Sequence, residues 1–244
     1  MKTLKLADRR RGILGSNAPL IGLIGPIGSG KSTVAGWLMD RGALVVDADL
    51  LTRSLMTPGT PVTEAIVAHF GEEFRHRDGS LDRAGLGRVV FANPILLADL
   101  EAIVHPAIGG VLEASIRAAD MKRPRAIVLE AIKLVEAGHA PWCDEVWLVN
   151  CSQATQLARL VQRGMSMTDA RQRIAAQAAS LPLWREAATL IVNSDGTRAE
   201  VEKAVDAALA AVRSERRGPG SRDADSAKAR GRAPVRGTKS GSRH

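Results

Sequence analysis

Short apolar runs alternate with longer segments of helical periodicity along most of this chain. Strands are predicted where β-branched and other apolar residues cluster: Leu20–Ile24, Ala43–Val46, Ala126–Leu129, Glu145–Val149 and Leu190–Val192. Helices are predicted between and after these runs: Ser32–Asp40, Val62–Phe70, Asp82–Phe91, Pro94–Ala119, Ser152–Gln162, Thr168–Ala179 and Arg198–Val212. This alternation predicts an α/β fold with a five-stranded parallel sheet, helices on both faces, and ligands at the carboxyl ends of the strands.

A glycine-rich loop follows the first predicted strand. Residues 25–32 read G-P-I-G-S-G-K-S, which fits the Walker A pattern G-x-x-x-x-G-K-[ST]. Backbone N–H groups of such a loop and the positive end of the next helix converge on nucleotide phosphates. We expect Lys31 to reach the terminal phosphates and Ser32 to ligate Mg²⁺. The predicted ATP-binding residues are Gly25, Pro26, Ile27, Gly28, Ser29, Gly30, Lys31, Ser32 and Thr33.

Acidic residues follow two other predicted strands at the same edge of the sheet. We expect Asp47 to face the triphosphate and to accept the proton of a hydroxyl that attacks the γ-phosphate, with Asp49 pointing elsewhere. An N-cap of the next helix is the alternative role for Asp47. Glu130 is a candidate for holding a magnesium-bound water or orienting the acceptor, and a surface carboxylate is its alternative.

Arginines cluster in the predicted helices between 152 and 179. Arg159 and Arg163 are four residues apart and lie on one helical face, and Arg171 and Arg173 follow after Gly164. Arginines that close over a triphosphate stabilise the charge of the transition state and exclude water. The segment at about 159–180 is therefore predicted to be a mobile lid, with solvated surface arginines as the alternative.

Composition indicates one core and a smaller appendage. The chain has 244 residues, of which 45% are hydrophobic. It has no apolar run long enough to span a bilayer and no signal-peptide pattern, so we expect a cytoplasmic protein that does not bind membranes. Cys143 and Cys151 have neither metal-ligand spacing nor a disulfide framework, which indicates reduced thiols.

The formal net charge of +8 comes from the two ends of the chain. Residues 1–17 and 213–244 carry the basic excess, and the segment 18–212 has more acidic than basic residues. We expect a flexible N-terminal extension and a disordered C-terminal tail, because the tail has almost no large apolar residues. The tail has the charge to touch nucleic acid through phosphates, and a solvated appendage without a specific partner is the favoured alternative.

The order of these motifs over about residues 20–212 resembles dephospho-coenzyme A kinase. The resemblance rests on the loop 25–32, Asp47-Ala48-Asp49 with Arg53, Phe70-Gly71, Asp78-Gly79, Leu81-Asp82-Arg83, Val90-Phe91, His105-Pro106, Gln156 with Arg159 and Arg163, Gln177 and Asn193. It implies a three-layer P-loop kinase of the nucleoside-monophosphate-kinase type, with a helical lid and acceptor-binding helices at about 50–120. It also implies transfer of phosphate from MgATP to the ribose 3′-hydroxyl of dephospho-CoA.

The resemblance also implies roles for individual residues. Asp47 would be the catalytic base, Lys31 and Ser32 the phosphate and magnesium residues, and Arg159 and Arg163 the catalytic arginines of the lid. The residues that would contact the acceptor are Asp47, Arg83, His105 and Glu136.

Two of the departures from the family pattern lie at the expected site. The chain has Gly25-Pro26 where two glycines are usual, and I-K-L-V-E at 132–136 where Pro-Leu-Leu-Phe-Glu is usual, so that Lys133 replaces an apolar residue beside the expected acceptor site. A contact with a substrate phosphate and a side chain that extends into water are both open for Lys133.

Two other functions stay open at the level of sequence. A kinase of another small hydroxyl acceptor, such as a nucleoside monophosphate or a sugar acid, would share the loop and the lid. A nucleotide-dependent switch or RNA-associated NTPase would use the basic tail. The sequence leaves the oligomeric state open, and its five histidines lack metal-ligand spacing.

Overall fold

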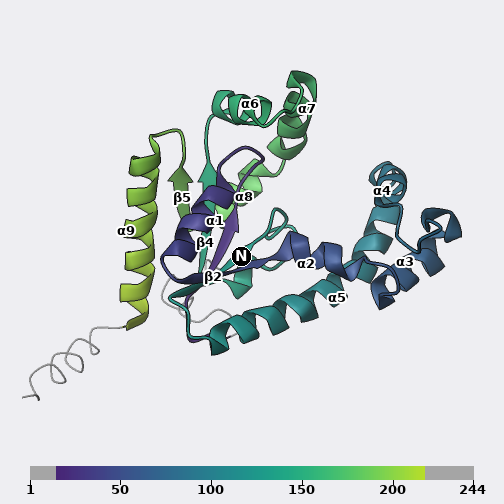
Figure 1. Cartoon of the computed structure of the whole chain (residues 1–244), viewed down its shortest axis with the longest axis horizontal. Helices are drawn as coiled ribbons and strands as arrows, with labels where there is room; N and C mark the ends of the chain where they lie inside the picture. The colour runs from purple at the N-terminus through teal and green to yellow at the C-terminus, as the bar shows by residue number, and fades with distance from the viewer. Residues whose placement is uncertain (1–14, 218–244) are drawn as a thin grey trace, which may run out of the picture.

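A five-stranded parallel sheet forms the centre of the molecule (Figure 1). The computed structural model describes residues 15–217, so the predictions for residues 1–14 and 218–244 lie outside the described part and stay predictions. The strand order is β2-β3-β1-β4-β5. The strands are β1 (Leu20–Ile24), β2 (Ala43–Asp47), β3 (Ala126–Glu130), β4 (Glu145–Asn150) and β5 (Leu190–Asn193). The predicted α/β class and five-stranded sheet are confirmed.

Alternating strand residues build two cores, one on each face of the sheet. In β1, Ile21 and Leu23 pack with α1 (Lys31–Asp40) and α9 (Arg198–Arg217), whereas Leu20 and Ile24 pack with α5 (Pro94–Met121) and α8 (Leu181–Ala187). Trp147 on the first face and Trp184 on the second are almost fully buried. The result is the three-layer arrangement expected from the sequence.

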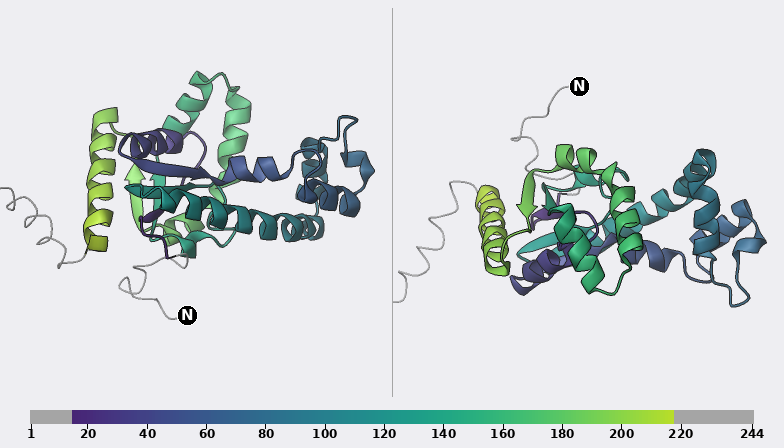
Figure 2. Two further views of the ribbon diagram at one scale, coloured as in Figure 1. Left: turned by 60° about the horizontal axis from the view of Figure 1, so that its bottom comes forward. Right: turned by 90° about the horizontal axis from the view of Figure 1, so that it is seen from above.

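The remaining helices lie at the carboxyl edge of the sheet and beyond it. Figures 1 and 2 show α6 (Gln153–Gln162) and α7 (Met167–Ala178) side by side above this edge. On the other side, α2 (Ala48–Leu55) leads to α3 (Pro61–Phe70) and α4 (Arg83–Phe91), which surround the N-terminal half of α5. Two short 3₁₀ turns complete the described elements: Glu72–Phe74 and Ala140–Trp142.

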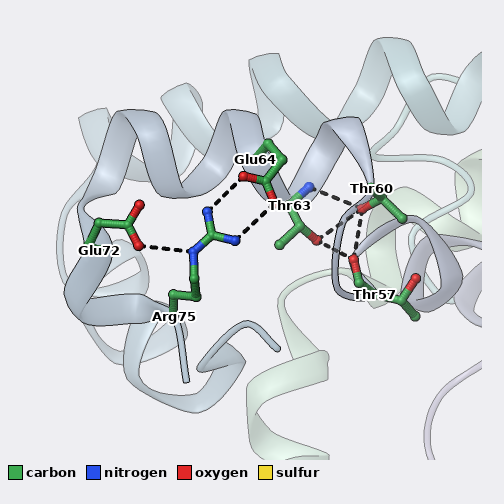
Figure 3. Close-up of polar contacts among 6 residues, drawn as sticks. All are labelled: Thr57, Thr60, Thr63, Glu64, Glu72 and Arg75. Carbon is green, nitrogen blue, oxygen red and sulfur yellow. Dashed lines mark hydrogen bonds and ion pairs between the residues drawn. The ribbon is translucent and has the colours of Figure 1, made fainter. Parts of the chain in front are cut away.

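The helices α3 and α4 form an outer lobe with its own small core. Ile66 and Leu86 are buried in it against Val104 of α5. Sequence-local polar contacts fix its entry and exit (Figure 3). The N-cap Thr60 accepts a hydrogen bond from the N–H of Thr63, whose hydroxyl donates to the Thr57 carbonyl at 2.8 Å.

Arg75 connects the segment after α3 to that helix. Arg75 donates two hydrogen bonds to Glu64 of α3, at 2.8 and 2.9 Å, and a third to Glu72 (Figure 3). These carboxylates raise the pKa of Arg75 still further above its already high ordinary value. The segment that links α3 to α4 is thereby held as part of one lobe.

The helix α5 connects the outer lobe to the sheet. Its C-terminal half packs Ile108, Leu112 and Ile116 on the sheet at the four-residue spacing of a helical stripe. By length and composition, α5 is the one helix in the described part of the chain that is apolar enough to cross a membrane. The same helix contributes residues to two hydrophobic cores, one on the sheet and one in the outer lobe.

The structure differs from the predicted elements mainly at short helices. The helices α2 and α8 have eight and seven residues, too few for a clear periodic pattern, and neither is predicted as a separate helix.

The ends of the described part also differ from the predicted boundaries. At the N-terminal boundary, Asn17 donates hydrogen bonds to Asp120 from its backbone and its side chain, at 2.9 and 3.0 Å. At the other boundary, α9 continues past Val212 to Arg217, within the segment expected to be disordered.

Candidate active site

The glycine-rich loop lies between the end of β1 and the start of α1. A Cβ at Gly25 would lie 2.4 Å from a backbone oxygen of β4, so no larger residue fits there. Gly28 has φ 77°, and a Cβ there would lie 2.9 Å from the carbonyl oxygen of Gln156. The N-cap of α1 is Gly30, and no side chain caps this helix. The first turn, with Ser32 and Thr33 exposed, is thus open to an anion.

Lys31 lies at the start of α1 and forms an ion pair with Glu130 at the end of β3. Both side chains are largely buried, with exposed fractions of 13% and 12%. In the register of β2 and β3, Glu130 lies opposite Asp47. The lysine of the loop and two strand-end carboxylates therefore meet at one edge of the sheet, as the sequence predicts.

The two aspartates after β2 have different surroundings. Asp47 is the N-cap of α2, and its Oδ1 accepts a hydrogen bond from the N–H of Leu50 at 2.8 Å. Asp49 lines a cavity between α2 and α5. The expectation that Asp49 points elsewhere is wrong, because α2 begins at Ala48 and Asp49 belongs to a helix that packs on α5.

The pKa of Asp49 reflects its position beside the loop. Burial raises this pKa above the ordinary value for an aspartate. The positive charge of Lys31 acts in the opposite direction, and the negative charge of Asp47 raises the pKa further. Asp49 thus lies within electrostatic range of Lys31 and Asp47.

Arg159 of α6 holds the glycine-rich loop from its carbonyl side. Its guanidinium donates to the carbonyl oxygens of Gly28 and Ser29, at 3.2 and 3.0 Å. It also donates to the hydroxyl and carbonyl oxygens of Ser194, at 3.1 and 2.7 Å. Arg159 therefore connects the loop to the segment after β5, and its predicted role as a phosphate ligand stays a prediction.

The helix α7 also contacts the loop, through a glutamine. Gln177 of α7 accepts a hydrogen bond from the N–H of Ile27 at 2.7 Å. In contrast, Arg163 at the C-cap of α6 is exposed, as are Arg171 and Arg173 of α7. A lid role for α6 and α7, and contacts of these three arginines with a nucleotide, stay predictions.

A cavity of about 220 Å³ lies next to Asp49. It is bounded by α2, by α5 and by the segment 131–139 that follows β3. Its lining is mostly apolar, with Leu100 and Val104 from α5 and Leu134 from the opposite wall. The polar lining residues are Asp49, Thr52, Glu101, His105, Lys133 and His139.

The predicted acceptor-binding residues divide into two groups. His105 lines the cavity, and Asp47 lies at the start of α2. Arg83 is exposed at the start of α4 in the outer lobe. Glu136 accepts a hydrogen bond from the indole N–H of Trp184 at 2.9 Å and so fixes α8. The structure thus gives Glu136 a packing role, and acceptor contacts by Arg83 and Glu136 stay predictions.

Hard oxygen donors at the loop fit a magnesium ion. Ser32 is exposed in the first turn of α1, and the Glu130 carboxylate lies at the loop beside Lys31. Within residues 15–217, no three His, Cys, Asp or Glu side chains are grouped so that they could hold a metal ion by themselves. Mg²⁺ keeps several waters and is bound by few protein oxygens together with substrate phosphates, and the Ser32 hydroxyl and the Glu130 carboxylate are oxygen donors of this kind.

Sequence reasoning misses two residues of this site and one contact of a third. The pattern does not place Asp49 in the cavity wall, although its position two residues after the strand-end Asp47 is the signal that finds it. Ser194 donates to the carbonyl oxygen of Ser29 in the loop, and no local pattern marks it. Gln177 belongs to the motifs that carry the resemblance, but its contact with the N–H of Ile27 follows only from the tertiary fold.

Comparison with known proteins agrees with this geometry. A model of the dephospho-CoA kinase family matches residues 19–199. The dephospho-CoA kinase of Geobacter metallireducens is 44% identical over 189 residues, which cover 76% of this chain and 92% of that protein. The dephospho-CoA kinase of Symbiobacterium thermophilum is 46% identical over 189 residues, which cover 76% of this chain and 79% of that protein.

Solved structures show the same architecture. The crystal structure of TT1252 from Thermus thermophilus has a TM-score of 0.65 and 30% identity, covering 80% of this chain and 97% of its own. Dephospho-CoA kinase from Campylobacter jejuni has a TM-score of 0.60 over 80% of this chain and 98% of its own, and its 20% identity supports the fold alone. The family match spans the sheet, the loop and the cavity, and the chain belongs to the dephospho-CoA kinase family.

Proposed function

We propose that this protein transfers the γ-phosphate of ATP to the ribose 3′-hydroxyl of dephospho-CoA, giving coenzyme A and ADP, the last step of coenzyme A biosynthesis. Family membership supports this function. The observation that carries it is geometric: Asp47 lies opposite Glu130, the ion-pair partner of Lys31, and Asp49, two residues further on in α2, lines the cavity. This arrangement joins a phosphate-binding loop to a cavity for an acceptor.

The loop binds the triphosphate through its backbone and through Lys31. Gly28 and Gly30 have positive φ angles, which turn backbone N–H groups toward the space where phosphate binds. Lys31 exchanges its carboxylate partner Glu130 for phosphate oxygens when ATP enters. Ser32 and Glu130 would hold Mg²⁺, directly or through water, and the bound ion supplies positive charge at the phosphates.

Asp49 is the better placed of the two aspartates to act as base. It lines the acceptor cavity, whereas one oxygen of Asp47 is engaged in capping α2. Asp49 accepts the proton of the 3′-hydroxyl as its oxygen attacks the γ-phosphate. Asp47 remains the competing candidate, and the comparison of the two asparagine variants in the Discussion decides between them.

The arginines divide between two tasks. Arg159 keeps the loop in its binding shape through the carbonyls of Gly28 and Ser29. Arg163 is free to approach the phosphates when α6 and α7 close, and there it stabilises the charge of the transferring group.

A cytoplasmic location fits the state of the cysteines. Cys143 and Cys151 are both buried and unbridged, as expected in a reducing compartment.

The outer lobe and α5 border the cavity and are proposed to form the acceptor-binding part, with the lid at α6 and α7.

An acceptor panel tests the proposed function. The purified full chain is given ATP and Mg²⁺ with dephospho-CoA, a nucleoside monophosphate, a sugar acid or RNA, and ADP release is followed by a coupled assay. We expect rapid ADP release with dephospho-CoA only. Equal or faster release with another hydroxyl acceptor, or stimulation by RNA, would overturn the proposal.

A further inference from the structure

Lys133 is the single lysine or arginine among the described residues that line the acceptor cavity. It follows β3 by three residues and is exposed on the cavity wall. Within residues 15–217, no carboxylate lies within 4.0 Å of its ammonium group. The loop lysine, Lys31, differs in that it is paired with Glu130. Lys133 thus presents an uncompensated positive charge to whatever enters the cavity.

The other ionisable groups of the cavity come from each of its walls. Asp49 comes from α2, Glu101 and His105 from α5, and His139 from the same segment as Lys133. Burial lowers the pKa of His139, and the charge of His105 acts in the same direction. Lys133 is therefore the one ammonium group among the described lining residues, and Asp49 and Glu101 are the two carboxylates.

The cavity lining extends along α5 from Leu97 to Leu112, a distance on the order of 20 Å at the rise of an α-helix. Asp49 and Lys133 belong to the same lining, which is mostly apolar. An acceptor that places its ribose at Asp49 brings the diphosphate of the same nucleoside close to this lining, where an unpaired anion is costly.

We propose that the Lys133 ammonium group binds the diphosphate of the acceptor and so determines affinity for diphosphate-bearing acceptors. This inference rests on the proposed function, because dephospho-CoA carries its diphosphate on the same nucleoside that is phosphorylated. An ammonium group at this place attracts phosphate oxygens through a charge-assisted hydrogen bond.

The test compares Lys133→Leu and Lys133→Arg with a matched surface variant, Lys203→Leu on the exposed side of α9. Steady-state kinetics give kcat and the KM values for dephospho-CoA and ATP, and calorimetry gives the affinity of the full chain for dephospho-CoA and for adenosine. For Lys133→Leu we expect KM and Kd for dephospho-CoA to rise about tenfold, which corresponds to about 1.4 kcal/mol. The KM for ATP, kcat and the affinity for adenosine stay unchanged.

The controls separate charge from packing and from the proposed function itself. Lys133→Arg keeps the charge and is expected to stay within about threefold of the parent, and Lys203→Leu is expected to have no effect; a tenfold loss in Lys203→Leu would overturn the inference. So would an unchanged KM for dephospho-CoA in Lys133→Leu, or an equal loss of adenosine affinity. If the parent protein does not phosphorylate dephospho-CoA at all, the proposed function fails instead.

Discussion

Lys31 and Glu130 form a largely buried ion pair that joins the start of α1 to the end of β3. The pair places Lys31 of the glycine-rich loop at the same sheet edge as Asp47, which ends β2 and lies two residues before Asp49 of α2. A buried ion pair is costly to break one-sidedly, because the remaining charge loses its partner. Stability and catalysis therefore make separate demands on Lys31, and they can be measured separately.

Replacing one member of this pair is expected to destabilise the fold, and replacing both restores it. Lys31→Met leaves Glu130 unpaired and lowers the free energy of unfolding by about 2 kcal/mol. Lys31→Met with Glu130→Gln recovers most of that loss in thermal unfolding. Both variants lose phosphoryl transfer, with less than about a tenth of the parent turnover, equivalent to more than about 1.4 kcal/mol of barrier. Turnover above that level in either variant contradicts the role of Lys31.

The asparagine variants of Asp47 and Asp49 separate the base from the cap. Asp49→Asn cannot accept the proton, so kcat is expected to fall by about two to four orders of magnitude with an unchanged melting temperature. Asp47→Asn keeps the cap on the Leu50 N–H and is expected to retain most of its activity. Asp47→Ala loses about 1 kcal/mol of stability.

A matched cap serves as the control. Asp82 caps α4 by accepting the N–H of Gly85 at 2.8 Å, so Asp82→Ala shows the thermal effect of a lost cap away from the loop. A large loss of kcat in Asp47→Asn, with near-normal kcat in Asp49→Asn, would return the base role to Asp47.

Because burial raises the pKa of Asp49, the acid limb of the pH profile of kcat is expected above the ordinary aspartate pKa of about 3.9.

The lid arginines are expected to respond differently to truncation. Arg159→Ala removes the bonds to Gly28, Ser29 and Ser194, so thermal stability falls by about 2 kcal/mol and the KM for ATP rises. Arg163→Ala leaves stability unchanged and lowers kcat by about a hundredfold. Gln162→Ala, an exposed neighbour on α6, is the control without effect. An Arg163→Ala enzyme with normal kcat would remove this residue from the reaction.

The buried thiol of Cys143 predicts how the free energy of unfolding changes at alkaline pH. Burial raises the pKa of Cys143 to about 12 in the folded protein, whereas an unfolded thiol ionises at about 8.5. The unfolded chain therefore binds fewer protons between these values, and the stability that is fully present below about 8.5 falls as pH rises toward 12. Denaturant titrations at a series of pH values measure this slope. A thiol reagent at pH 8 is expected to label Cys143 only after unfolding, and rapid labelling of the folded protein contradicts this.

The strands and the loop follow from the sequence because their signals are local. Buried parallel strands are continuous apolar runs, so Leu20–Ile24 coincides with β1. The loop 25–32 has a fixed spacing that its backbone geometry requires.

The roles of Asp47 and Asp49 depend on where β2 ends, and a difference of one residue changes which carboxylate enters a helix. The contacts of Arg159 and Gln177 with the loop cannot be predicted from local sequence patterns, because each joins residues more than a hundred positions apart in sequence. Such contacts are set by the packing of α6 and α7 over the sheet edge.

The central claim is that the 3′-hydroxyl at this cavity receives the γ-phosphate of ATP. ³¹P nuclear magnetic resonance of a reaction containing the full chain, ATP, Mg²⁺ and dephospho-CoA tests it most directly. We expect a new phosphomonoester signal that is coupled to the ribose 3′-proton and that appears at the same rate as ADP. Inorganic phosphate in place of that signal, or a phosphoester at another hydroxyl, would contradict it.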